Sequence, residues 1–311
     1  MSDLILHHYP TSPFSEKVRL MLGHKGLAWK SVHIPRIMPK PDVLALTGGY
    51  RRTPFLQIGA DIYCDSALIA EVLDHRQPEP PLYPAPARGL SRVLAQWADS
   101  TLFWAAMGHN LSPKGAAALF AGQPPEAAAA FAADRGAMRT NMTVLRPSDA
   151  TSAYRSYLRR LSSMLDDQPF LLGSTPCIAD FAAYHPLWFS RVVNPAMAGV
   201  LDATPDVLEW MGRMAAIGHG RPETLGSADA IALARASQPA ALTDEAFQDD
   251  HGMALGTRVT VAPEAFGTEP TEGILRAATR TRYTLERTDE RAGTVHVHFP
   301  RVGFSLKEVK A

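Results

Sequence analysis

The residues best placed to do chemistry are two serines near the start of the chain, Ser12 and Ser15. A short apolar run, Leu4–Leu6, precedes them and predicts a buried strand. The residues that follow predict a helix, because apolar side chains recur at helical spacing as far as Gly26. Pro13 suits its first turn. We therefore expect Ser12 at a helix N-terminus, where negative charge on a nucleophile or a bound thiolate is stabilised.

The spacing of these serines is that of the C-x-x-C pair of a thioredoxin-like fold, with hydroxyls in place of both sulfurs. The motif alone does not distinguish a chemical role for Ser12 from that of an ordinary helix cap. Tyr9 and Ser15 are the alternative partners of a thiolate if Ser12 only caps the helix.

Two further stretches offer groups for a ligand. Pro54 stands at the head of the expected strand Phe55–Ile58, and a cis Thr53-Pro54 bond would turn the Thr53 backbone toward a ligand. Ser66 at a helix start offers an anion site, and Asp65 beside it can hold an ammonium group. A ligand that meets all three groups would be extended and peptide-like, zwitterionic at one end and carrying a thiol.

The elements that would position these residues form an α/β unit. A second strand is expected over Ala28–Ile34, a helix or irregular link over Lys40–Leu46, and a hairpin from Phe55–Ile58 and Asp61–Tyr63 turning at Gly59-Ala60. An amphipathic helix begins at Asp65-Ser66. The order is βαβ followed by ββα.

In this order and spacing, the stretches SPFSEKVR, RRTPFLQIG and CDS-ALIAEVLD resemble the glutathione-binding domain of the cytosolic glutathione transferases. The resemblance is closest to serine-type classes such as tau and zeta. It covers roughly the first 225 residues and implies a thioredoxin-like domain (1–78) followed by an all-helical domain (87–225). It further implies a cytoplasmic homodimer that uses glutathione in detoxification.

The resemblance also implies roles for individual residues. Ser12 would hydrogen-bond the glutathione sulfur and favour its thiolate, without itself attacking the substrate. The remaining contacts to glutathione would come from Lys40, Thr53, Pro54, Asp65 and Ser66. Asp65 stands where the family usually has Glu, and its shorter side chain keeps the charge. The electrophile pocket would be lined by Phe14, Trp104, Met107 and Phe120.

Composition excludes several other classes. The 311 residues are 46% hydrophobic, and 31 basic side chains balance 31 acidic ones, which leaves no net field for nucleic acid or an anionic membrane. No apolar run reaches the length of a membrane span. Cys64 and Cys177 are too few for a disulfide framework. A cytoplasmic protein is the default expectation.

The middle of the chain is helical in pattern after the proline-rich linker at 78–86. A long apolar stripe runs from Leu90 to Trp104, and further helices are expected over Ser152–Leu165 and Ala179–Val193. The alanine-rich stretch at 113–137 reads as a short helix under a mobile cover. Cys177 stands where the family has a capping Ser or Thr, with Asp180 three residues on, so we expect a buried cap residue rather than a reactive thiol.

The last block, residues 250–311, changes to a period of two and predicts five short strands, a small SH3-like barrel. It should pack on its own chain or a dimer partner and contribute nothing to the glutathione site. Arg282 and His296 should face outward, whereas seven apolar residues should face inward: Val259, Val261, Leu275, Leu285, Val295, Val297 and Phe299. His296 and His298 share a strand face, but without an evident third ligand we predict paired surface imidazoles and no metal.

Two functions remain open. The first is an enzyme that uses glutathione thiolate to conjugate, isomerise or reduce a small electrophile. The second is a non-catalytic glutathione-binding interaction or sensing protein whose last block recruits a partner. The Ser12, Thr53-Pro54 and Asp65-Ser66 set favours the enzyme, and the appended strands favour the alternative.

Overall fold

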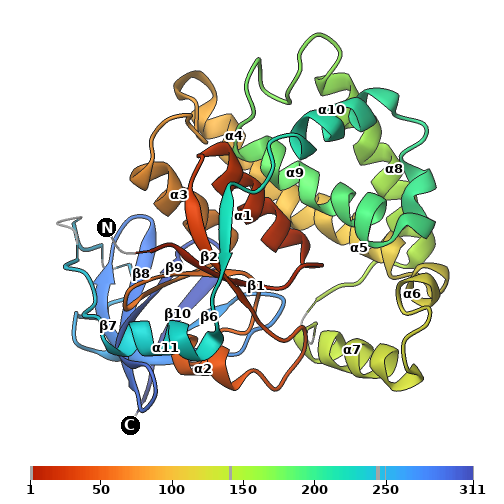
Figure 1. The fold of residues 1–311 in the computed structure, drawn as a ribbon. Coiled ribbons are helices and arrows are strands. Elements are labelled where there is room, and N and C mark those ends of the chain that lie inside the picture. The colour runs from red at the N-terminus through yellow and green to blue at the C-terminus, as the bar shows by residue number, and fades with distance from the viewer. Residues whose placement is uncertain (1–2, 140–141, 243–245, 249, 311) are drawn as a thin grey trace.

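The computed structural model describes residues 3–139, 142–242, 246–248 and 250–310. Figure 1 shows a helical part on one side and a sheet on the other, with both chain ends on the sheet side. Helix α1 lies between them. No described helix is long and apolar enough to cross a membrane.

The first domain is the predicted βαβ-ββα unit. Its elements are β1 (Ile5–His8), α1 (Pro13–His24), β2 (Ala28–His33), α2 (Pro41–Thr47), β3 (Phe55–Ile58), β4 (Asp61–Cys64) and α3 (Ser66–Arg76). Strand β1 pairs in parallel with β2 and antiparallel with β3, which forms the hairpin with β4. Helix α1 begins with Pro13 at its first position, and Gly26 takes the left-handed conformation (φ 63°) just after it ends.

The helical domain follows the proline-rich linker. Its elements are η1 (Ala85–Ala87), α4 (Arg88–Trp97), η2 (Ala98–Leu102), α5 (Phe103–Asn110), α6 (Pro113–Leu119), α7 (Pro125–Met138), α8 (Pro147–Met164), α9 (Ile178–Trp188), η3 (Phe189–Val193), η4 (Pro195–Val200) and α10 (Pro205–Ala215). The apolar stripe that starts at Leu90 thus continues through α4, a wider turn at η2, and α5. Helix α10 was missed, although Trp210 within it is completely buried.

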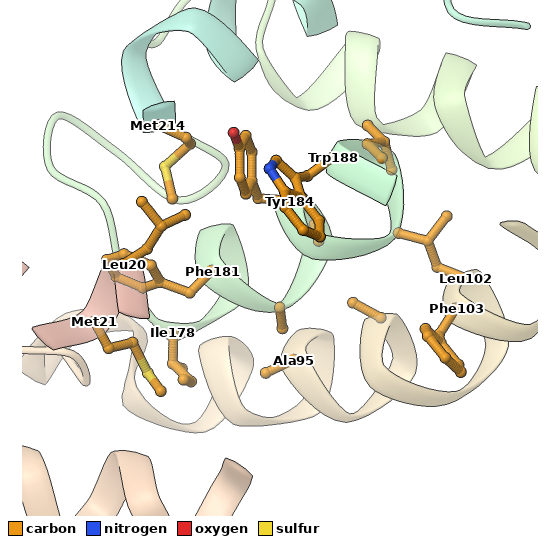
Figure 2. Close-up of a cluster of buried hydrophobic side chains, with 14 of the residues drawn as sticks. Leu20, Met21, Ala95, Leu102, Phe103, Ile178, Phe181, Tyr184, Trp188 and Met214 are labelled. Carbon is orange, nitrogen blue, oxygen red and sulfur yellow. The ribbon is translucent and has the colours of Figure 1, made fainter. Parts of the chain in front are cut away.

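The core of the helical domain also receives helix α1. Figure 2 shows Leu20 and Met21 of α1 beside Ile178 and Phe181 of α9, with Ala95 of α4 facing them. All five side chains are buried, which joins the first domain to the second through one continuous apolar core.

The stretch predicted as one short helix under a cover contains two helices, α6 and α7. Pro113 and Pro125 each begin a helix at a position where a missing N–H costs nothing. Few of their residues are buried, as their alanine content predicted, and α7 stands apart from the main helical bundle in Figure 1.

The chain then returns to the first domain. Strand β5 (Arg221–Thr224), which the sequence did not predict, pairs in parallel with β2. Helix α11 (Ser227–Arg235), expected at Ala228–Ala236, follows it and lies beside α2 on the lower face of the sheet in Figure 1. Backbone pairing alone places β5, because its side chains are all exposed and give no periodic signal.

The last block contains the five predicted strands, β6 (Arg258–Pro263), β7 (Thr271–Ala278), β8 (Arg282–Asp289), β9 (Gly293–Pro300) and β10 (Phe304–Glu308). These strands form an added β region, but not a separate sheet. Strand β9 pairs in parallel with β4, so that one sheet runs in the order β10-β6-β7-β8-β9-β4-β3-β1-β2-β5. The unpaired edge of β4 is thereby covered. SH3-like closure of the five strands stays a prediction.

The side-chain directions in the added β region are mostly as expected. The seven apolar residues predicted to face inward are completely buried, in a core that also contains Ile62 and Phe55 of the first domain. The outward placement of His296 is wrong. Its side chain is buried against Asp61, because the parallel pairing of β9 with β4 covers the face that the sequence pattern left open.

Cys177 is the buried N-cap of α9, as predicted. Asp180 accepts hydrogen bonds from the Cys177 and Leu171 backbone N–H groups at 3.0 and 2.9 Å and from Trp210 Nε1 at 3.0 Å. Burial raises the pKa of the Cys177 thiol to about 12, so it stays protonated and unreactive at neutral pH.

Candidate functional site

A cleft of about 690 Å³ lies between the first domain, the helical domain and the added β region. It brings together nine of the ten predicted site residues: Ser12, Phe14, Lys40, Thr53, Pro54, Asp65, Ser66, Trp104 and Met107. They come from loops and helix starts that are up to 95 residues apart in the chain. Phe120 is not among the residues that line the cleft. It packs on Phe131, at 5.4 Å between ring centroids, and Phe131 lines the cleft in its place.

Ser12 caps α1 at the floor of the cleft. Its Oγ accepts a hydrogen bond from Ser15 N at 3.2 Å, and the residue is 2% exposed. The hydroxyl proton of Ser12 is therefore available to a second acceptor, while the helix dipole favours negative charge at the same place. A thiolate is one such acceptor.

The two alternative partners of a thiolate are placed differently. Tyr9 lines the cleft, and its hydroxyl lies 3.4 Å from Arg135 Nη2, which donates to it. Ser15 is completely buried and is not a lining residue. The structure therefore leaves Ser12 and Tyr9 beside the cavity, and only Ser12 at the helix N-terminus.

The Thr53–Pro54 peptide bond is cis, as predicted. Lys40 connects this loop to the start of α2, because its Nζ donates to Arg51 O at 3.3 Å and to Thr53 Oγ1 at 3.4 Å. Burial and the nearby Arg135 lower the pKa of Lys40 to about 8. These contacts are to neutral oxygens, so the ammonium group can still take a carboxylate partner in the cleft.

Asp65 takes a left-handed backbone conformation (φ 77°) and caps α3, with Oδ1 accepting from Ala67 N at 2.9 Å. Its other oxygen lies 3.8 Å from Arg52 Nη1. Ser66 Oγ accepts from the fully buried Lys17 Nζ at 3.1 Å. Asp65 thus presents a carboxylate at the cleft while the backbone N–H groups of α3 point the same way.

Sequence reasoning missed the ionic support beneath these residues. Lys17 pairs with Asp99 at 2.5 Å, and His185 Nε2 lies 3.0 Å from the same carboxylate. Although burial opposes ionisation, the Lys17 ammonium and His185 keep the pKa of Asp99 below its ordinary value. No sequence spacing connects these residues, which lie on α1, η2 and α9.

The added β region forms part of the cleft wall, which corrects the expectation that it contributes nothing to the site. Glu264, Ala265, Phe266 and Gly303 line the cleft. The first three belong to the β6–β7 loop, residues 264–270. This loop reaches the cleft because β9 anchors the added strands beside β4, close to the Thr53-Pro54 turn.

Three kinds of contact hold the β6–β7 loop in place. The Phe266 ring packs edge-on against Trp104, with 5.1 Å between ring centroids. Arg52 Nε donates to Phe266 O at 2.5 Å, and Gly267 N donates to Met138 O at 2.8 Å. Glu269 pairs with Arg51 at 2.8 Å. The loop therefore connects Arg51 and Arg52 to Trp104 on the other side of the cleft.

The side of the cleft that is lined by Phe14, Trp104 and Phe266 also carries positive charge. Arg36, Arg135 and Arg139 line it, whereas Glu264 is the one carboxylate that the added β region places in the lining. Arg139 lies over the Trp104 ring at 5.7 Å, and burial followed by the charge of Arg135 lowers its pKa. Desolvated cations of this kind favour an anionic group on a bound molecule.

Comparison with known proteins identifies the family. The glutathione S-transferase N-terminal domain matches residues 6–81, and the glutathione S-transferase C-terminal domain matches residues 113–213. The chain belongs to the glutathione transferase family.

Individual proteins of known sequence or structure are also similar to this chain. A crystal structure of a GST-like protein from Pseudomonas syringae is 43% identical, with a TM-score of 0.82 over 99% of this chain and 100% of that one. FtsZ-localized protein A of Caulobacter vibrioides is 28% identical over 184 residues, which are 57% of this chain and 73% of that protein. The structure of FzlA from C. crescentus is 25% identical, with a TM-score of 0.51 over 68% of this chain and 87% of that one.

Proposed function

We propose that this protein binds glutathione in the cleft and adds its thiolate to a small electrophile, as a serine-type glutathione transferase. The observation that carries the proposal is the position of Ser12 Oγ, which lies at the N-terminus of α1 in the same cleft as Thr53, Asp65 and Lys40. This is the arrangement that a thiol flanked by two charged ends requires.

Each end of glutathione then has a partner of suitable charge. Asp65 and the start of α3 take the γ-glutamyl ammonium and carboxylate, and Lys40 takes the glycyl carboxylate. The Thr53 backbone takes the cysteinyl unit, which leaves the sulfur beside Ser12. The Ser12 hydroxyl donates to the thiolate and, with the helix dipole, lowers the pKa of the bound thiol.

In conjugation, the thiolate forms a carbon–sulfur bond with the electrophile while the leaving group departs with its bonding electrons. The thiol proton goes to solvent. Isomerisation and reduction need the same thiolate, and the cleft supports all three. Phe14, Trp104 and Phe266 suit an aromatic electrophile, and Arg139 suits one that carries a carboxylate.

The test is turnover of 4-chloro-3-nitrobenzoate with glutathione, compared between the wild type and Ser12→Ala. We expect Ser12→Ala to slow conjugation by about tenfold to a hundredfold, as for loss of one donor to a developing anion. Glutathione affinity should stay nearly unchanged. Ser15→Ala is the matched control, because Ser15 is a buried serine of the same helix start outside the lining.

The thiolate absorbance of bound glutathione must titrate at higher pH in Ser12→Ala than in the wild type. Identical titration curves would refute the role of Ser12 and leave Tyr9 as the next candidate. The uncharged analogue 4-chloro-3-nitrobenzamide separates the electrophile class. If it is turned over as well as the benzoate, the arginine-lined side does not select a carboxylate.

A second candidate is a partner-binding protein without turnover. It is favoured by the similarity to FtsZ-localized protein A and by exposed apolar side chains outside the cleft. Leu90 and Val93 of α4 are 58% and 66% exposed, and Val302 of the added β region is 70% exposed. Co-sedimentation with FtsZ polymers that survives Ser12→Ala but fails in Leu90→Ser/Val93→Ser would support it.

We propose a cytoplasmic homodimer as the working assembly. Both cysteines are free and buried, which suits a reducing compartment, and two-fold dimers are the commonest assembly of soluble oligomers. Light scattering on the intact protein checks the assembly. A monomer at micromolar concentration would contradict it.

A further inference from the structure

A second cluster of functional side chains lies away from the cleft, where the added β region joins the first domain. It consists of Asp61 of β4 and His296 and His298 of β9, each with one ligand atom within 4.8 Å of the others. The parallel register places Asp61 directly opposite His296 and puts His298 beside the same carboxylate. All three residues are buried, at 4%, 8% and 2% exposure.

Three side-chain atoms of the cluster face one another: Asp61 Oδ1, His296 Nδ1 and His298 Nε2. We call them the inward-facing atoms, and the second oxygen or nitrogen of each side chain is its outward-facing atom. The aspartate oxygen is 2.9 Å from the His298 nitrogen and 3.8 Å from the His296 nitrogen. Ligand atoms of a tetrahedral zinc ion lie roughly 3.3–3.5 Å apart, given Zn–N and Zn–O lengths of about 2.0–2.1 Å. Both separations differ from that value by at most about 0.6 Å, and the two histidine nitrogens lie within 4.8 Å of each other.

The outward-facing atoms already have partners. Thr284 Oγ1 lies 2.9 Å from His298 Nδ1, and Ala240 N donates to Asp61 Oδ2 at 2.8 Å. Glu286 Oε2 lies 3.6 Å from His296 Nε2. Metal-binding histidines are usually held through their second nitrogen in this way, by a hydroxyl or a carboxylate.

One atom in the cluster has no partner. His296 Nδ1 is buried and makes no hydrogen bond within the described residues, although it faces Asp61 Oδ1. A buried nitrogen left without a hydrogen-bond partner keeps the cost of its lost hydration. A cation bound between the three inward-facing atoms would remove that cost and replace the His298–Asp61 hydrogen bond by coordination.

We infer that Asp61, His296 and His298 bind a divalent transition-metal ion, zinc foremost, that fastens β9 to β4. Two imidazoles and one carboxylate are a borderline donor set that suits zinc better than calcium or magnesium. Asp61 and Glu286 supply two negative charges near the proposed ion. Two arginines lie close by: Arg276 is paired with Glu286, and Arg282 lies near His298, where its charge opposes the cation. The role is structural, because the β4–β9 register spans only three residue pairs.

The experiment uses the full chain, purified without a metal-affinity tag and stripped with EDTA. Zinc binding is measured by competition with a chromophoric chelator, and Tm is measured with and without zinc. We expect one equivalent of zinc and a rise in Tm on its addition, because a ligand that binds only the folded state stabilises it. Cobalt(II) should give the intense visible bands of a tetrahedral site.

His296→Ala should weaken zinc binding by about tenfold to a hundredfold or more, and it should remove the rise in Tm. The matched control is His75→Ala, which removes an exposed histidine of α3 outside the cluster and should bind zinc as the wild type does. Asp61→Asn provides a second variant that keeps the size of the side chain, should His296→Ala fail to fold. If the wild type binds no zinc beyond the level of either variant, the cluster is a hydrogen-bond network and the inference is wrong.

Discussion

At the scale of single residues, the cleft depends on charges held in fixed places. Asp65 combines three features: a left-handed backbone, a cap on α3 and a carboxylate oxygen facing the cleft. Asn is the natural probe, because it tolerates the same backbone conformation and can still cap the helix. We expect Asp65→Asn to weaken glutathione binding by about 1–3 kcal/mol, as for a lost charge-assisted contact.

Calorimetry at pH 7 measures that change. Its control is the melting temperature of Asp65→Asn, which should stay close to that of the wild type. Unchanged glutathione affinity in a folded Asp65→Asn protein would remove Asp65 from the proposed site.

Lys40 predicts a pH dependence of binding. Because its pKa is lowered to about 8, the free protein carries a charged Lys40 below pH 8 and loses that charge above it. Only the charged form attracts a carboxylate. Binding of S-methylglutathione, which has no ionising thiol, should therefore be strongest below pH 8 and weaken roughly tenfold to thirtyfold by about pH 9.5.

The control for this titration is Lys40→Arg. Its guanidinium stays charged over the whole range, so the change assigned to Lys40 should be absent from the Lys40→Arg curve and should appear as the difference between the two curves. Parallel curves for the two proteins would mean that another group, such as the ligand's own amine, accounts for the pH dependence.

At the scale of elements, the β6–β7 loop connects two strands and also forms one wall of the cleft. The Phe266 ring contacts Trp104, whereas the hydrogen bond from Arg52 reaches Phe266 at its backbone oxygen. Phe266→Ala should therefore remove the aromatic contact and spare the arginine contact. We expect KM for an aryl electrophile to rise about fivefold to tenfold, equivalent to an aromatic pair of about 1–1.5 kcal/mol.

Steady-state kinetics at saturating glutathione measure this effect. Phe247→Ala, which removes a half-exposed phenylalanine outside the cleft lining, should leave KM unchanged. If Phe266→Ala changes glutathione affinity and not KM for the electrophile, the loop serves the other end of the site.

At the scale of the whole molecule, the added β region and the first domain share one sheet and one core. Val297 and Phe299 of β9 are completely buried in the same cluster as Ile62 and Phe55. Removing residues 250–311 would uncover this cluster and the edge of β4. Each large apolar side chain contributes about 1.5–3 kcal/mol when buried, so losing several costs an amount comparable to a typical stability of about 5–15 kcal/mol.

We therefore expect the chain truncated after residue 249 to lose cooperative thermal unfolding and to aggregate. Circular dichroism melting and size-exclusion chromatography measure both properties. A truncated chain that melts cooperatively near the wild-type Tm would show that the first two domains are autonomous. If that folded chain also bound the aryl electrophile as the full protein does, the β6–β7 loop would have no role in the cleft.

Sequence alone determined the local elements that carry the cleft. A cap followed by proline, a strand headed by proline and an acidic residue before a helix each specify their own backbone within a few residues, so Ser12, Thr53-Pro54 and Asp65 were predictable. The inward pattern of the last five strands was predictable for the same reason, because alternation along one strand records which face is buried.

Only the tertiary structure decided how those elements combine. Strand β9 pairs with β8 and also with β4, which is more than 230 residues away. The hydrophobic period of each strand does not indicate that second pairing. That single pairing buries His296 beside Asp61 and brings Phe266 to Trp104, and neither contact has a sequence spacing that could reveal it. The backbone conformation of a short segment depends mainly on its own residues and their neighbours. Long-range contacts depend instead on how whole elements pack against one another.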